Sequence, residues 1–299
     1  MNLTDIMDEQ LCNPTIPSIR PRLTAHPSAA SIELSDGSIV GGCLRSEYYR
    51  ITGEEPTERT TPMQQMKFRM GDKMHELVTE VLTEARIIDA IETDIWIPEY
   101  RIHGRIDAIV ADDETDNKIG VEIKSVWGYH GKKLVIIPQR GVLEPKQDHV
   151  LQSLIYLDFF SQFGMELWKL FYIARDNGEY NEHTIKFEGE DKHACIKSGI
   201  GGTYIHYPDL KIQGIKDRFS KFWGYVNANE LPPRDYVIQY NKEKLLALAE
   251  AGDLSKDDTA KAKEGRFVDK GDWRCRYCKY SSKCWDGYDG QKLWSGEEQ

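Results

Sequence analysis

The spacing of apolar residues predicts two prominent helices. Between Pro62 and about Ala90 they recur every three or four positions, the period of an amphipathic helix. Residues 146–163 are apolar on most faces and predict a second, buried helix. Further helices are expected around 207–229 and 242–263.

Shorter apolar runs between the helices predict strands. Segments 91–97, 100–110 and 119–126 read as consecutive strands, with an acidic turn at 112–117 before the third. Two more strands are expected at 167–174 and 182–187, and a small hairpin at 31–40. Strands between two helical regions predict an α/β protein with a central mixed β-sheet flanked by helices.

The same pattern divides the chain into five segments. Residues 1–30 are rich in Pro, Ser and Thr and are expected to form an extended N-terminal arm. A short N-terminal segment at 31–61 precedes the core at 62–190. A helical region at 191–264 and a C-terminal cysteine-bearing segment with a polar tail at 265–299 complete the chain.

Composition narrows the class of protein. The formal net charge of −10 argues against a generally basic protein that coats nucleic acid. The first thirty residues contain no apolar run typical of a signal peptide, and no segment approaches the length of a membrane span. We therefore expect a cytoplasmic protein that has no membrane partner.

Two adjacent predicted strands carry charged residues in an apolar setting. Glu122 and Lys124 are two apart and project from the same face of their strand. Asp107, on the preceding strand, is placed near Glu122 if the two strands pair as a hairpin. Two neighbouring carboxylates suit Mg²⁺ or Mn²⁺, and Lys124 could then stabilise a water or an oxyanion. A structural charge pair is the alternative.

Polar residues on the two main helices could join this site. His75 lies at the edge of the apolar stripe of the first helix, four residues after Gly71, and is either a ligand or a satisfied core or surface residue. Gln152 and Tyr156 share one face of the buried helix. A buried Gln needs hydrogen-bond partners, so a structural bond to the sheet is the alternative to a functional role.

These residues, in this order, resemble the motif series of the PD-(D/E)XK nuclease superfamily. The nearest likeness is to its RecB-like branch, which includes CRISPR-associated and phage exonucleases. The resemblance spans roughly residues 41–285 and rests on Gly71 and His75, Gly104-Arg-Ile-Asp107, Glu122-Ile-Lys124 and Gln152-Ser-Leu-Ile-Tyr156. One departure is that Ile106 stands where the superfamily usually has proline.

The resemblance implies a restriction-endonuclease-like core and a role for each motif residue. His75, Asp107 and Glu122 would bind the divalent metal together with the backbone carbonyl of Ile123. Lys124 would be the catalytic lysine. Gln152 and Tyr156 would position this lysine or the DNA backbone.

A cysteine array near the C-terminus has the spacing of a metal site. Cys275, Cys278 and Cys284 form C-x2-C-x5-C, and Cys43 is the natural fourth ligand because Cys12 lies in the arm and Cys195 in a separate segment. The arrangement resembles the [4Fe-4S] site of many RecB-like nucleases. Zn²⁺ is the alternative metal. Either would clamp the N-terminal segment to the C-terminal one.

Two basic stretches interleaved with aromatic residues could bind DNA. Segment 124–147 carries a net charge of +4 and segment 261–284 carries +5, although the whole chain is acidic. Positive charge with aromatic platforms suits single-stranded DNA, whereas the alternative is a solvated basic surface. The candidate contacts are Arg45, Trp127, Tyr129, Lys132, Lys133, Arg140 and Lys146.

Together these features predict a metal-dependent DNA exonuclease with Mg²⁺ or Mn²⁺ in its active site. Its substrate would be single-stranded DNA or duplex ends, in recombination, repair or CRISPR-adaptation-like processing. The resemblance implies that the protein acts in the cytoplasm of a prokaryote, or of the host of a virus, and that its partners could include recombination or CRISPR adaptation proteins. The alternatives are a catalytically silent DNA-binding or assembly subunit and a zinc-stapled structural protein.

Overall fold

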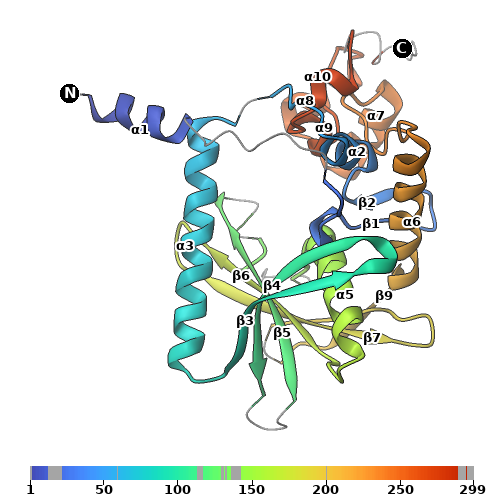
Figure 1. Cartoon of the computed structure of the whole chain (residues 1–299). Coiled ribbons are helices and arrows are strands. Elements are labelled where there is room, and N and C mark those ends of the chain that lie inside the picture. Colours follow the sequence, from blue (N-terminus) through green and yellow to red (C-terminus); the bar gives the residue numbers. More distant parts are fainter. Residues whose placement is uncertain are drawn as a thin grey trace. The chain divides into compact units, whose positions relative to one another are not determined.

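Figure 1 shows the computed structural model, which describes residues 2–12, 22–58, 60–112, 117–128, 131, 133–135, 143–199, 201–288 and 294. The chain forms two compact units. The first consists of Met1–Gly42 and Thr60–Glu230, and the second of Cys43–Arg59 and Leu231–Gln299. Each unit therefore combines segments that are distant in the sequence.

A seven-stranded mixed sheet is the centre of the first unit, in the order β3-β4-β5-β6-β7-β8-β9. All neighbours are antiparallel except β5 and β6, which are parallel. The predicted α/β class with a mixed sheet flanked by helices is confirmed. The strands are β3 Ile88–Ile97, β4 Ile102–Ala111, β5 Lys118–Val126, β6 Trp168–Ala174, β7 Tyr180–Glu188, β8 His193–Ser198 and β9 Tyr204–Lys211.

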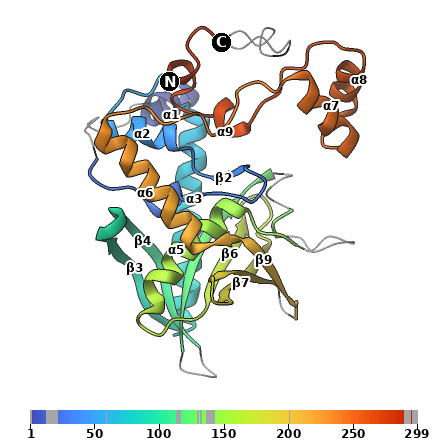
Figure 2. The ribbon, with the colours of Figure 1, turned by 90° about the vertical axis from the view of Figure 1, so that its right-hand side faces the viewer.

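Helices α3 (Pro62–Glu84) and α5 (Gln147–Ser161) cover opposite faces of this sheet (Figures 1 and 2). Val78 of α3 packs against Val121 and Ile123 of β5. Side chains alternate along a strand, so Glu122 and Lys124 point to the other face, toward α5. Thr61 begins α3 with a reciprocal capping box, in which its hydroxyl and the side chain of Gln64 each bond the other's backbone N–H.

Smaller elements complete the first unit. The short strands β1 (Ser31–Glu33) and β2 (Ile39–Gly41) form the predicted hairpin, and α6 (Ile212–Ala228) packs against β1. The 3-10 helices η1 and η2 span Pro27–Ala29 and Pro98–Tyr100. Trp223 of α6 donates its indole N–H to the carbonyl of Tyr100 at 2.5 Å.

The second unit has a small core of its own, formed by Leu245, Ala262 and Val268. Its helices are α2 Leu44–Thr52, α7 Lys242–Ala251, α8 Lys256–Lys263, α9 Trp273–Arg276 and α10 Ser281–Cys284. No helix in the described part of the chain has the length and apolar character needed to cross a membrane.

Several element predictions were wrong. The segment 191–264 is not wholly helical, because β8 and β9 occupy most of residues 193–211 and extend the central sheet. The arm at 1–30 is not simply extended, since α1 spans Leu3–Cys12. The helix predicted at 242–263 is two helices, α7 and α8, because Gly252 adopts a positive φ of 79° and ends the first.

Candidate active site and cysteine pocket

The candidate site forms where β4 and β5 stop pairing. Their ladder runs from Ala111 and Lys118 to Ala108 and Val121 and then ends. Beyond it, the Asp107 carboxylate accepts the backbone N–H of Ile123 at 2.6 Å. The side chain therefore takes the place of a ladder bond and is held between the two strands, near Glu122 as predicted.

Glu122 and Lys124 form a network with the buried helix. Lys124 Nζ lies 2.5 Å from Glu122 Oε1 and 3.0 Å from Gln152 Oε1. Gln152 Nε2 in turn donates to Glu122 Oε1 at 2.8 Å. The amide of Gln152 thus bonds both charged groups, which fixes their positions relative to each other.

Burial makes the Glu122 carboxyl the most strongly perturbed acid of this network. It raises the pKa of Glu122 to about 7, the Lys124 ammonium opposes the rise, and the Asp107 carboxylate adds to it. Glu122 Oε2 is buried and has no hydrogen-bond partner among the described residues. A buried carboxylate oxygen without a partner is costly, so this atom calls for a cation or a proton.

His75 and Tyr156 extend the site on its two sides. His75 Nδ1 lies 3.4 Å from Asp107 Oδ1. Burial opposes protonation of His75, but the Asp107 carboxylate outweighs it and raises the pKa of the imidazole. Tyr156 donates its hydroxyl to the carbonyl of Arg105 at 3.1 Å and lies 3.4 Å from Gln152 Nε2. The predicted site residues of both helices therefore meet at the sheet.

The donor set suits a hard divalent cation, although its side chains bond one another in this structure. Within the described residues, no three His, Cys, Asp or Glu side chains are arranged to hold a metal ion as they stand. Two carboxylates and an imidazole are nevertheless ordinary ligands for Mg²⁺ or Mn²⁺, and Glu122 Oε2 is the unpartnered atom that such an ion would satisfy.

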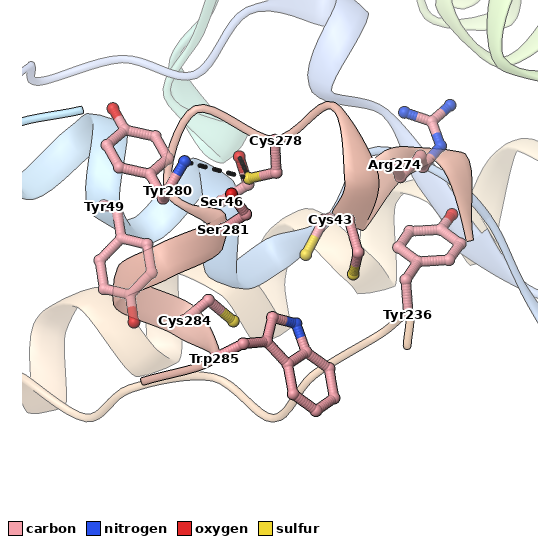
Figure 3. Close-up of a pocket in the computed structure, with 11 residues that line it drawn as sticks. Cys43, Ser46, Tyr49, Tyr236, Arg274, Cys278, Tyr280, Ser281, Cys284 and Trp285 are labelled. Carbon is pink, nitrogen blue, oxygen red and sulfur yellow. Dashed lines mark hydrogen bonds between the residues drawn. The ribbon is translucent and has the colours of Figure 1, made fainter. Parts of the chain in front are cut away.

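The four predicted ligand cysteines line one pocket of the second unit (Figure 3). The cavity has a volume of about 20 Å³, and Tyr236, Arg274, Tyr280 and Trp285 also line it. Cys43 is the residue immediately before α2, whereas Cys275 and Cys284 belong to α9 and α10. All four are free thiols.

The surroundings of these thiols contain donors that suit thiolates. The backbone N–H of Tyr280 donates to Cys278 Sγ at 3.4 Å, and Arg45 Nη1 lies 4.0 Å from Cys284 Sγ. The buried indole N–H of Trp285 interacts with the Cys275 thiol and opposes the rise in its pKa. Burial raises the pKa of Cys275 to about 12 and also raises that of Cys43, so both are protonated thiols unless a metal displaces the proton.

Ion pairs neutralise much of the second basic stretch. Five of its cations pair with carboxylates, three of which lie outside the stretch. The pairs are Lys261 with Asp257, Arg266 with Glu264, Lys270 with Asp258, Arg276 with Asp269, and Lys283 with Glu54. Its net charge of +5 therefore overstates the positive potential that DNA would meet.

The other candidate DNA contacts fall in different environments. Arg45 donates its Nε to the carbonyl of Pro232 at 2.6 Å and is half-buried in the second unit. Trp127, Lys133 and Lys146 are exposed in the first unit. Tyr129, Lys132 and Arg140 lie outside the described residues. The DNA contacts of all these residues stay predictions.

Three residues near the candidate site were missed from the sequence. Arg175 directly follows β6 and donates its Nη1 to the carbonyl of Lys67 in α3. Ser125 follows Lys124 in β5 and lies beside the same helix at Gly71. Of the three, only Lys67 could have been found from the sequence, because it lies eight residues before His75 and so shares its face of the helix.

Comparisons with known proteins identify no family. No family model matches the chain, and no curated protein matches it. One solved structure, titled "Crystal structure of SSO0001", superposes with a TM-score of 0.42 and 16% sequence identity. That match covers 95% of this chain and 96% of the other. A similarity this low carries no argument about function.

Proposed function

We propose that the protein is a Mg²⁺- or Mn²⁺-dependent deoxyribonuclease that degrades DNA from ends, with single-stranded DNA or duplex ends as substrate. The observation that carries the proposal is the buried Glu122, whose unpartnered Oε2 lies in a cluster with Asp107, Lys124 and Gln152. Charged groups gathered in an apolar setting with a strongly shifted pKa are typical of catalytic sites. The motif resemblance adds the reaction, hydrolysis of a phosphodiester.

The residues divide the chemical work between them. His75, Asp107, Glu122 and the carbonyl of Ile123 would hold the ion, which when bound activates water and neutralises charge on the phosphodiester. Lys124 is a three-proton donor that uses two donors on Glu122 and Gln152, so the third can stabilise the developing oxyanion. Gln152 positions this ammonium, and Tyr156 supports Gln152 from the next helical turn.

We extend the proposal to the second unit, where the four cysteines would hold a [4Fe-4S] cluster, with zinc as the alternative. Four thiols on one pocket, with the Trp285 N–H directed to one of them, fit such a group. A cavity of about 20 Å³ admits one water-sized body, so zinc would enter with little movement and a cluster would require outward rotation of side chains. Either would join Cys43–Arg59 to the C-terminal segment.

Digestion of end-labelled DNA tests the proposed activity. Purified protein should release nucleotides from labelled single-stranded or duplex DNA with Mg²⁺ or Mn²⁺ and should release none with a chelator. Lys124→Ala and Glu122→Gln should each lower the rate at least about 100-fold, since each removes a charge from the reacting centre. Lys169→Ala is a matched control, because Lys169 pairs with Glu182 on neighbouring strands of the same sheet. Full activity in both site variants would overturn the assignment.

A catalytically silent DNA-binding or assembly subunit is the competing function. It predicts DNA binding without hydrolysis under any divalent metal, and equal binding by wild type and Lys124→Ala. Release of internal fragments from a circular substrate would instead indicate an endonuclease. End-labelled linear DNA and the circular substrate together separate the three outcomes.

A further inference from the structure

The face of α3 that carries His75 continues toward the start of the helix through Gly71 and Lys67. These residues are four positions apart, and four residues of helix rise about 6 Å, so the three are stacked along one face. The ends of β5 and β6 lie beside this face. The candidate metal site at His75 is therefore the first of three successive positions.

At the middle position, the backbone of Gly71 faces the polar side chains of Ser125 and Arg175. A Cβ on Gly71 would lie 3.2 Å from Ser125 Oγ and 3.9 Å from Arg175 Nη1. Arg175 is anchored there by its backbone N–H, which donates to the Val126 carbonyl at 2.9 Å, and by its side-chain bond to Lys67. The absence of a side chain at Gly71 thus lets the helix backbone pack closely against this hydroxyl, with the guanidinium beside it.

The Arg175 guanidinium is incompletely paired where it lies. Its Nε is buried and has no hydrogen-bond partner in the described part of the chain. Burial lowers the pKa of Arg175, and Asp176 opposes this shift. The residue is partly exposed, so an anion can approach the guanidinium from solvent. A phosphate is the anion whose geometry suits an arginine fork and a neighbouring hydroxyl.

At the third position, an aromatic ring stands beside a cation. Lys67 Nζ lies 4.5 Å from the ring centroid of Trp127, a cation-π contact that orients the indole. The Trp127 side chain keeps 55% of its surface exposed despite this contact. An exposed indole held in place is a stacking platform for a nucleobase, and stacking on it does not depend on base identity.

We propose that these three positions form a track for one unpaired DNA strand, an inference that rests on the proposed nuclease function. The phosphate next to the scissile one binds Arg175 and Ser125 from the solvent side, beside Gly71, and the base beyond it stacks on Trp127. One nucleotide then corresponds to about one turn of α3. A base inside a duplex already has a neighbour on each face and cannot stack on the indole, so the track selects single strands or frayed ends without reading their sequence.

The competing explanation is that Arg175 only braces α3 against β6. That role would require its bond to Lys67 but no effect on DNA, and it would assign nothing to Trp127. The two explanations therefore differ most at Trp127, an exposed side chain whose removal leaves no cavity. They also differ in the salt dependence of binding, because each phosphate contact releases counterions.

Binding of a fluorescein-labelled oligo-dT, followed by anisotropy with Ca²⁺ in place of Mg²⁺, tests the track. Trp127→Ala should weaken binding at least about fivefold, and Trp127→Phe should retain most of the affinity. Arg175→Met should weaken binding and lower the slope of log affinity against log salt by about 0.7, whereas Arg175→Lys should keep the slope. Trp96→Ala is the matched control, since Trp96 is 45% exposed on β3 and lies outside the track.

The outcomes separate this inference from the proposed function. If the wild type cuts DNA but Trp127→Ala binds and cuts as Trp96→Ala does, the track is wrong and the nuclease assignment stands. If the wild type neither cuts nor binds the oligonucleotide, both fail. If Arg175→Met does not fold, Ser125→Ala and Trp127→Ala decide, and wild-type affinity in both overturns the track.

Discussion

The Asp107 carboxylate accepts the N–H of Ile123 at 2.6 Å, just beyond Ala108 and Val121, the last paired residues of β4 and β5. This bond replaces the ladder contact that the diverging strands no longer make. One carboxylate oxygen therefore has a structural role, while the other faces His75 at 3.4 Å. The same residue supports the fold of the site and belongs to its proposed ligand set.

The two roles of Asp107 can be separated by substitution. Asp107→Asn keeps an acceptor for the Ile123 N–H but loses the charge, so we expect near-wild-type stability and at least about a 100-fold loss of nuclease activity. Asp107→Ala loses both the acceptor and the charge. It should lower the free energy of unfolding by a further 1 to 3 kcal/mol or so, because the buried N–H of Ile123 is left unpaired. Urea denaturation and the end-label assay measure the two effects. Equal stability of the two variants would contradict the structural role.

The stability of the metal-free protein should report the buried Glu122 carboxyl. Its pKa is raised to about 7, above the value in an unfolded chain, so deprotonation is penalised in the folded state. The protonated Glu122 carboxyl therefore stabilises the folded protein at low pH, and this contribution is lost as the pH rises through about 7. The Gln side chain of Glu122→Gln does not titrate. The midpoint of thermal unfolding of this variant should therefore exceed that of wild type by an amount that grows between pH 5 and pH 8.

We expect that growing difference to correspond to about 1 to 3 kcal/mol in the free energy of unfolding. Thermal unfolding in chelator at several pH values measures it. Added Mn²⁺ should reduce the difference between the two proteins at pH 8, because the ion stabilises only the wild-type carboxylate. A difference independent of pH would show that Glu122 is not perturbed by burial.

Close packing at Gly120 predicts a large effect of one methyl group. A Cβ there would lie 2.0 Å from Cζ3 of Trp168, which is fully buried on the neighbouring strand. Gly120→Ala should therefore destabilise the protein by roughly 2 to 4 kcal/mol. Gly224→Ala in α6 is the control, since nothing lies within 4 Å of its Cβ, and it should stabilise by about 0.5 to 1 kcal/mol. Denaturant midpoints distinguish the two.

The cysteine pocket predicts different outcomes for two buried thiols. Anaerobically purified wild type should contain iron and acid-labile sulfide, or one zinc ion if the alternative holds. Cys275→Ser should lose that metal and lower the melting temperature, because Cys275 lines the pocket. Cys195→Ser should retain the full metal content, since Cys195 lies on β8 in the other unit. Equal metal content in both variants would exclude Cys275 as a ligand.

Local patterns predicted the part of the site that depends on strand alternation. Glu122 and Lys124 were expected on one face because two-residue spacing fixes this, and they lie 2.5 Å apart. The meeting of Asp107 with Glu122 followed from the short hairpin that joins their strands. A buried amide needs partners, so Gln152 was expected to have either a functional role or a structural bond to the sheet, and it contacts Glu122 and Lys124.

What could not be predicted depends on tertiary contacts. Arg175 has no local signal, since only the approach of α3 to the end of β6 gives it a role. The ion pair of Lys283 in the second basic stretch could not be predicted because its partner, Glu54, is over 200 residues away. The strand β9 was absorbed into a predicted helix because Leu210 and Ile212 extend the apolar spacing of α6 backward.

The assembly of the second unit from two distant segments imposes an order on biosynthesis. Arg45 and Cys284, which lie in contact, are 239 residues apart. At about 5 to 20 residues per second, a ribosome needs roughly 10 to 50 s to make the intervening chain. Throughout that interval the Cys43 thiol has emerged without its three companions, whereas the sheet of the first unit can form. Loading of the proposed cofactor would therefore be a late event, and a stalled nascent chain would carry both a folded sheet and an unprotected thiol.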